Sequence, residues 1–205
     1  MYNLIDVKKD TSYIHLISEI EKDAIGSSHR NRKNYIDLET VISKFLSYEI
    51  LLDENDKLIA ASGLQVYPGN SGRVASRTYI MSDYRKQAGG RLQLSEDIFV
   101  PYEVEVAKEH GLDAVFFTIE LLRRRNAVSR FCKNLQRNNL NFTLYPQMIN
   151  TCRKYISNGI ECTNYEQPCW QNAGVLELTG ELTLPTMSVA EYNDRYYDDE
   201  VNRLK

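Results

Sequence analysis

The 205-residue sequence has little histidine and few cysteines, and this scarcity limits the metal chemistry that it can support. It contains 3 His, and its 4 cysteines, Cys132, Cys152, Cys162 and Cys169, form no C-x-x-C pair. Protein zinc sites are built mostly from such pairs and from neighbouring His residues. We therefore expect no metal site, and we interpret the cysteines as free thiols in a reducing compartment.

The sequence also lacks a long apolar run and an excess of charge of one sign. No apolar stretch approaches the roughly 18 residues that mark a membrane-spanning helix. The first residues, MYNLIDVKKD, lack the basic and apolar regions of a signal peptide. The formal net charge is −3, with 26% charged and 42% hydrophobic residues, as in an ordinary globular protein. We expect a cytoplasmic protein without membrane contact, and the overall charge does not indicate nucleic acid as a partner.

The apolar patterns predict a mixed α+β protein. Strands are predicted at 3–7, 48–52, 57–67, 73–81, 113–119, 141–145 and 170–178. Helices are predicted at 10–25, 38–46, 96–110 and 126–137, and residues 146–169 are predicted to be irregular. An antiparallel meander followed by helix, strand and helix indicates a mixed sheet flanked by helices.

Several positions carry more local predictions. Ser95 is expected to cap the third helix, and Gly111 to end it at the C′ position. Strand 73–81 is expected to alternate, with Val74, Ser76, Thr78 and Ile80 on one face. Residues 188–191 (SVAE) have the pattern of a capping box at the start of a short helix.

The segment 82–92 (SDYRKQAGGRL) combines three basic residues with two adjacent glycines. It follows a predicted strand and precedes a predicted helix. The backbone N–H groups of such a loop can surround a phosphate. A solvated turn is the alternative interpretation.

Three stretches resemble the GCN5-related N-acetyltransferase (GNAT) family. Residues 80–86 (IMSDYRK) resemble the end of the family's fourth strand, 107–117 (AKEHGLDAVFF) its third helix and fifth strand, and 126–133 (NAVSRFCK) its fourth helix. The resemblance implies one GNAT-like domain over residues 1–178, with a mixed, mostly antiparallel central sheet flanked by helices. Residues 179–205 are expected to form a polar C-terminal tail with a short helix.

The resemblance also implies that acetyl-CoA, or another acyl-CoA, binds in a V-shaped gap between the fourth and fifth strands. Loop amides would hold the pyrophosphate at the N-terminus of the third helix, and a backbone N–H near Met81 or Ser82 would polarise the acyl carbonyl. The residues expected to bind the cofactor are Met81, Ser82, Arg85, Lys86, Gln87, Ala88, Gly89, Gly90 and Asn126.

The sequence departs from the family pattern in the loop and in the general acid. Ala88 occupies the first glycine position, and residues 91–95 add chain ahead of the helix. The fourth helix lacks the tyrosine that the family uses as an acid. Cys132 and Tyr145 are the candidates to replace it, and a buried, small apolar role is the alternative for Cys132.

The residues expected to face the acceptor are Arg30, Arg32, Tyr79 and Glu120. The predicted function is transfer of an acetyl group to a primary amine of a small molecule or peptide, and a homodimer is left open. A catalytically silent GNAT-like domain that binds a ligand or partner is the main alternative. A third interpretation is an RNA-associated factor, which would use the basic residues of the fourth helix.

Overall fold

The computed structural model describes residues 2–26, 43–87, 93–120, 127–145, 149–157, 160–180, 186–188 and 190–191. Its strands are β1 (Asn3–Asp6), β2 (Phe45–Leu52), β3 (Leu58–Tyr67), β4 (Ser71–Ile80), β5 (Ala114–Glu120), β6 (Thr143–Leu144), β7 (Ile149–Ser157) and β8 (Ile160–Glu177). Its α-helices are α1 (Leu16–Gly26), α3 (Ser82–Gln87), α4 (Val100–Glu109) and α5 (Ala127–Arg137). A 3-10 turn η1 (Thr11–Tyr13) precedes α1, and a π-helical turn η2 (Ser95–Phe99) leads into α4.

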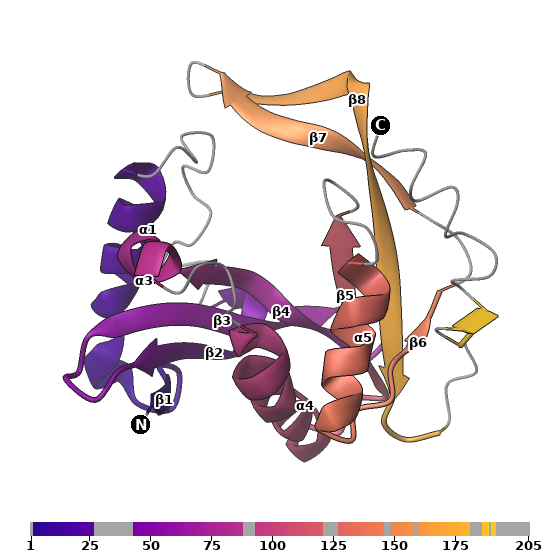
Figure 1. Cartoon of the computed structure of the whole chain (residues 1–205), viewed down its shortest axis with the longest axis horizontal. Coiled ribbons are helices and arrows are strands. Elements are labelled where there is room, and N and C mark those ends of the chain that lie inside the picture. Colours follow the sequence, from indigo (N-terminus) through magenta and orange to yellow (C-terminus); the bar gives the residue numbers. More distant parts are fainter. Residues whose placement is uncertain are drawn as a thin grey trace.

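One sheet runs through the molecule in the order β1-β2-β3-β4-β5-β8-β6, and β7 pairs with β8 (Figure 1). Among the described strands, only β4 and β5 pair in parallel, and the other pairings are antiparallel. The mixed, mostly antiparallel sheet flanked by helices confirms the predicted fold class. Among the described residues, we find no helix that is both long and apolar enough to span a membrane.

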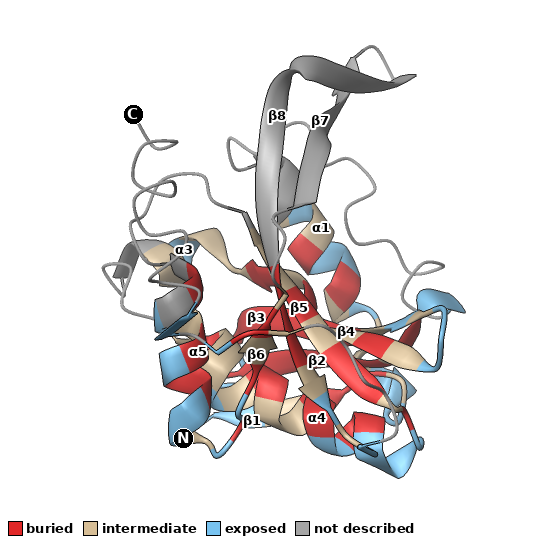
Figure 2. Cartoon of the chain, turned by 90° about the vertical axis from the view of Figure 1, so that its right-hand side faces the viewer, coloured by how far each residue is buried: buried red, intermediate tan, exposed pale blue. Residues whose placement is uncertain are grey.

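Helices cover both faces of the sheet. On one face, Ile17 and Ile20 of α1 belong to the same apolar cluster as Ile50 of β2. On the other face, Phe99 of η2 belongs to the same cluster as Leu51 of β2. Buried residues accordingly follow the strands and the inner sides of α4 and α5, whose outer sides are exposed (Figure 2).

The predicted helix 38–46 and the predicted irregular stretch 146–169 differ from the structure. Phe45 and Leu46 begin β2, so the predicted helix 38–46 is wrong at its end, and residues 38–42 lie outside the described part. Residues 146–169, predicted to be irregular, contain β7 and the first half of the 18-residue strand β8. These strands pair antiparallel up to Ser157 and Ile160, and in Figure 1 they extend away from the rest of the sheet.

The π-helical turn η2 accommodates Pro101. The N–H of Val100 donates to the carbonyl of Ser95 and not to that of Glu96, and Pro101 has no N–H to replace it. The side-chain Nδ2 of Asn138 instead donates to the Glu96 carbonyl at 2.9 Å. Ser95 therefore lies within the helical stretch, and the prediction that it caps a helix starting at Glu96 is wrong.

Other helix ends agree with the sequence. Gly111 has φ +66°, and its N–H donates to Lys108, while the N–H of Leu112 donates to Ala107. This is a Schellman motif with Gly111 at C′, as predicted. Near the C-terminus, Ser188 N donates to Glu191 Oε2 at 2.7 Å and Glu191 N to Ser188 Oγ at 3.2 Å, which confirms the capping box.

Candidate functional site

Strands β4 and β5 separate after a short parallel pairing. Residues 71–73 of β4 pair with residues 114–116 of β5, yet β4 continues to Ile80 and β5 to Glu120. At the last paired position, Nη2 of Arg73 donates to Oγ1 of Thr118 at 2.6 Å. We call this divergence the fork, formed by residues 74–80 of β4 and 117–120 of β5. Within the fork, the parallel strands β4 and β5 are no longer paired through their backbones.

Within the fork, β4 has an irregular backbone. Ala75 and Arg77 have φ values of 51° and 56°, in the left-handed region that non-glycine residues seldom occupy. The register between β3 and β4 shifts on both sides of Gly63. We call this stretch, residues 75–77, the bulge.

The bulge also changes which side chains of β4 are buried. Val74, Ser76 and Tyr79 are buried, whereas Thr78 is only partly buried. The predicted alternation through residues 73–81 is therefore wrong beyond Ser76, because a bulge inserts residues and reverses the alternation of side chains.

The segment 82–92 begins as a short helix, α3, which is attached to α1 through Asp23. The backbone N and the Oγ of Ser82 donate to the Asp23 carboxylate at 2.8 and 2.6 Å, and the hydroxyl of Tyr79 donates to it at 2.9 Å. Partial burial alone would raise the pKa of Asp23, but the hydrogen bonds from Ser82 and Tyr79 lower it below the usual value. The sequence analysis did not single out Asp23, which resembles any polar residue of an amphipathic helix.

Two backbone amides that were predicted to polarise an acyl carbonyl have acceptors within the chain. Met81 N donates to the carbonyl of Ile59 at 2.8 Å, and Ser82 N donates to Asp23. An acyl oxygen would have to displace one of these acceptors. The roles of Met81 and Ser82 stay predictions, and they now require a local rearrangement.

Arg85 folds back over the end of β4. Its Nη2 donates to the carbonyl of Ile80 at 2.6 Å, and its guanidinium carbon lies 5.2 Å from the centre of the Tyr79 ring. Arg85 is thus held at the end of β4 with its positive charge near Asp23, whose pKa it helps to lower.

The other predicted site residues are described in part or lie outside the described residues. Tyr79 is buried and bonded to Asp23, and its role toward an acceptor stays a prediction. Only the backbone is described for Lys86, Gln87 and Glu120. Outside the described part lie Arg30, Arg32, Ala88, Gly89, Gly90 and Asn126.

Of the two candidate acids, Cys132 lies in the core. It is fully buried on α5, and burial raises the pKa of its thiol to about 12. Such a weak acid does not readily protonate a leaving thiolate whose own pKa is near the usual value of about 8.5. Burial therefore favours the alternative that Cys132 is a small apolar core residue. Tyr145 directly follows β6, where its N–H donates to Ala173, and its role stays a prediction.

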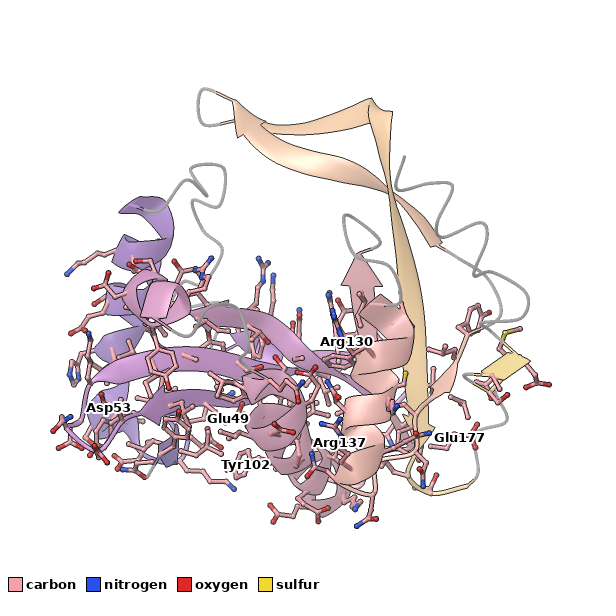
Figure 3. The ribbon with its side chains drawn as sticks, in the orientation of Figure 1. Glu49, Asp53, Tyr102, Arg130, Arg137 and Glu177 are labelled. Carbon is pink, nitrogen blue, oxygen red and sulfur yellow. The ribbon has the colours of Figure 1, made fainter. Side chains whose placement is uncertain are left out.

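A row of polar side chains crosses the sheet beneath α4. Asp6 of β1 is in register with Glu49 of β2, which is in register with Ser62 of β3. From α4, Glu103 reaches Ser62, whose Oγ lies 2.8 Å from Glu103 Oε1. We call Asp6, Glu49, Ser62 and Glu103 the buried polar row. Figure 3 labels Glu49 in the sheet and Tyr102, the neighbour of Glu103, on α4.

Burial makes the two glutamates of this row weak acids. Glu49 and Glu103 are both fully buried. Burial raises the pKa of Glu103 to about 7. Burial, together with the charge of Glu103, raises the pKa of Glu49 well above its usual value. The sequence analysis identified neither residue.

Comparison with known proteins relates this geometry to one fold. No family model and no curated protein matches the sequence. Solved structures do match. A candidate acetyltransferase from Acinetobacter baylyi ADP1 has 15% identity and a TM-score of 0.55, over 91% of this chain and 97% of that chain. The yncA protein of Salmonella typhimurium, solved with its cofactor acetyl-CoA, has 14% identity and a TM-score of 0.53, over 90% and 97%.

A third match carries the family name. An acetyltransferase of the GNAT family from Staphylococcus aureus Mu50 has 12% identity and a TM-score of 0.50, over 86% of this chain and 100% of that chain. The chain therefore has the fold of the GNAT acetyltransferases, as the sequence resemblance implied. At these identities, the comparison concerns the fold and leaves the activity to be argued from the site.

Proposed function

We propose that the chain is an acyl-CoA-dependent N-acyltransferase, which transfers an acetyl group from acetyl-CoA to a primary amine. The fork is the observation that carries this proposal. Beyond Arg73, β4 has no strand partner on its β5 side among the described strands. An extended part of a ligand can form hydrogen bonds to the unpaired backbone of such a strand edge, as an added strand would.

The reaction places two demands on the site. The amine nitrogen attacks the acyl carbonyl, so that a C–N bond forms and the C–S bond breaks. The amine must lose a proton, and the departing thiolate must gain one. We retain Tyr145 as the candidate acid, because Cys132 is buried in the core with a pKa of about 12. The acceptor is proposed to be a small-molecule or peptide amine.

A catalytically silent domain that binds acyl-CoA or another ligand is the second candidate. It is favoured by the amides of Met81 and Ser82, which already donate to Ile59 and Asp23. A domain that only binds its ligand has no need of a free amide at the acyl carbonyl.

Titration of the full chain with acetyl-CoA tests the proposal. We expect one site by calorimetry and a thermal shift, since a ligand at 100 times its Kd stabilises the folded state by about 2.7 kcal/mol. Mass spectrometry of a panel of small amines and peptides should then reveal an acetylated product. The absence of binding at millimolar acetyl-CoA would contradict the proposal, whereas binding without any acetylated product would support the silent domain.

A further inference from the structure

Ala75, the first residue of the bulge, has both of its backbone polar groups bonded to side chains. Its N–H donates to Glu103 Oε2 at 2.6 Å, and its carbonyl accepts from Thr78 Oγ1 at 2.9 Å. The Oγ of Ser62 lies 2.8 Å from Glu103 Oε1 and 2.9 Å from Thr78 Oγ1. These contacts form a closed ring that starts and ends at Ala75 and passes through Glu103, Ser62 and Thr78. We call it the bulge ring.

The number of hydrogen atoms in the ring identifies the form of Glu103 that completes it. Three contacts join two oxygen atoms: Glu103 with Ser62, Ser62 with Thr78, and Thr78 with the Ala75 carbonyl. The two hydroxyl groups supply one hydrogen each, so the third must come from the Glu103 carboxyl group. If Glu103 is ionised, the Ser62 hydroxyl donates to the carboxylate and the Thr78 hydroxyl donates to the Ala75 carbonyl. The contact between the two hydroxyl oxygens then has no hydrogen atom.

The surroundings of Glu103 also favour the neutral form. Its side chain is fully buried, and the effect of burial on its pKa outweighs the hydrogen bonds with Ala75, Ser62 and Glu49, which lower that pKa. Asp6 of β1 lies beyond Glu49 and accepts a hydrogen bond from Tyr102 of α4 at 3.4 Å. Among the described residues, no cation contributes to the pKa of Glu103, and Lys9 donates to the Tyr102 hydroxyl at 3.3 Å, at the Asp6 end of the row. An uncompensated buried charge is costly, and a proton on the carboxyl group removes that cost.

We propose that Glu103 is a positioning residue, which as a neutral carboxylic acid closes the bulge ring and thereby fixes β4 in the shape that opens the fork. The left-handed conformations of Ala75 and Arg77 cost free energy, and such conformations persist only where the surrounding structure holds them. The part of this inference that concerns acyl-CoA rests on the function proposed above. The contacts of the bulge ring do not depend on that function.

Nuclear magnetic resonance of the ligand-free full chain tests the ring directly. With 13C-labelled glutamate and uniform 15N labelling, we expect the Glu103 carboxyl group to titrate near pH 7, as its pKa of about 7 requires. The Ala75 amide should shift with the same midpoint. The control is the amide of Gly69, in an exposed turn away from the ring, which should not shift with that midpoint. An Ala75 amide that ignores this titration, or a Glu103 carboxyl group that titrates at its ordinary value, would overturn the proposal.

Three variants connect the ring to acetyl-CoA binding. Glu103→Gln keeps an acceptor and a donor, as in the neutral acid, whereas Thr78→Val removes the hydroxyl and Thr78→Ser retains it. At pH 6 we expect Glu103→Gln and Thr78→Ser to match the wild-type affinity within about twofold. Thr78→Val should bind about tenfold more weakly, because it removes from the ring both contacts of the Thr78 hydroxyl, which are partly buried. At pH 8.5 the wild type should bind more weakly than Glu103→Gln.

The two experiments separate the ring from the proposed function. Equal affinities for the wild type, Glu103→Gln and Thr78→Val at both pH values would overturn the positioning role. If the wild type does not bind acetyl-CoA at all, the proposed function fails, and the titration of the Ala75 amide still decides whether Glu103 closes the ring.

Discussion

The two faces of β2 are equally buried but differ in chemistry. On the α1 side, Ile50 and Leu52 pack with Tyr48 in an apolar cluster. On the α4 side, Glu49 lies beside Leu51 and belongs to the buried polar row. The first face follows the ordinary pattern of a protein core. The second places carboxyl groups where apolar side chains would stabilise the fold more.

This difference indicates that the α4 face serves more than stability. Its polar row leads through Ser62 to the bulge of β4, whereas the α1 face meets β4 mainly through the apolar cluster around Tyr79. We therefore expect substitutions on the α1 face to lower stability at every pH. Substitutions in the polar row should instead change how stability and ligand binding depend on pH.

The largest expected effect is on the apolar face. Ile50→Ala should lower the free energy of unfolding by about 3–4 kcal/mol, because Ile50 is fully buried and the substitution leaves a cavity. Urea unfolding at pH 5.5 and pH 8 should give the same loss. A loss that differs between the two pH values would contradict the division between the faces.

The second prediction concerns the pH dependence of stability. Folded Glu103 keeps its proton up to a pKa of about 7, while the unfolded chain releases it near the usual value. The folded state thus binds more protons between these values, and stability falls as pH rises from about 4.5 to 7. Relative to Glu103→Gln, the wild type should lose about 3 kcal/mol over this window.

Urea unfolding of both proteins at half-unit pH steps measures this difference. Glu103→Gln is the matched control, because carboxyl groups away from Glu103, such as Asp23, contribute equally to both curves. The difference between the curves therefore reports Glu103 together with Glu49, whose pKa the charge of Glu103 raises. Parallel curves would mean that Glu103 ionises in the folded state as it does in water.

The third prediction concerns Arg85, at the end of β4. Arg85→Ala should weaken acetyl-CoA binding about tenfold, or 1.4 kcal/mol, if its guanidinium helps to hold the pyrophosphate. Calorimetry measures the affinity, and Lys57→Ala in an exposed turn controls for the loss of one positive charge. Equal affinities for the two variants would remove Arg85 from the binding site.

The smallest expected effect is at the contact between α1 and α3. Asp23→Asn should lower the free energy of unfolding by about 1 kcal/mol, since the carboxylate accepts bonds from Ser82 and Tyr79 but is partly exposed to solvent. The pKa of Asp23 is lowered in the folded chain, so its carboxylate stabilises the fold above the usual pKa of an aspartate. This stabilisation is lost as the pH falls below that value. Glu19→Gln, on the exposed side of α1, should change the free energy of unfolding by only a few tenths of a kcal/mol. A loss of the same size in both variants at neutral pH would contradict the role of Asp23.

The order of β1 to β5 could be predicted because local signals mark each element. Polar turn residues at 53–56 separate β2 from β3, and the apolar run 113–119 predicted the central strand β5. Gly111 and the Ser188 capping box were predicted for the same reason, since each depends on residues close in sequence.

The β7–β8 hairpin had a signal that the sequence analysis did not use. β7 ends at Ser157 and β8 begins at Ile160, and the two residues between them in the sequence are Asn and Gly. That dipeptide is the strongest short-range indication of a hairpin, but the surrounding strands are too polar to show a clear apolar alternation.

Part of the buried polar row could also have been found from the sequence. Glu103 lies between Val100 and Val104 at the helical spacing of a buried stripe, which Ala107 continues. A charged residue at such a position is informative. The bulge could not be predicted, because it depends on a contact between Ala75 and Glu103, which are 28 residues apart and meet only in the folded sheet.

The central claim is that the fork between β4 and β5 binds acyl-CoA, and amide chemical shifts on addition of acetyl-CoA test it most directly. We expect the largest shifts in residues 74–82 and 117–119, on the two arms of the fork, with little change in β1 and β2 on the far side of the sheet. Shifts that concentrate on β1 and β2, or saturating acetyl-CoA without any shift at the fork, would contradict the account.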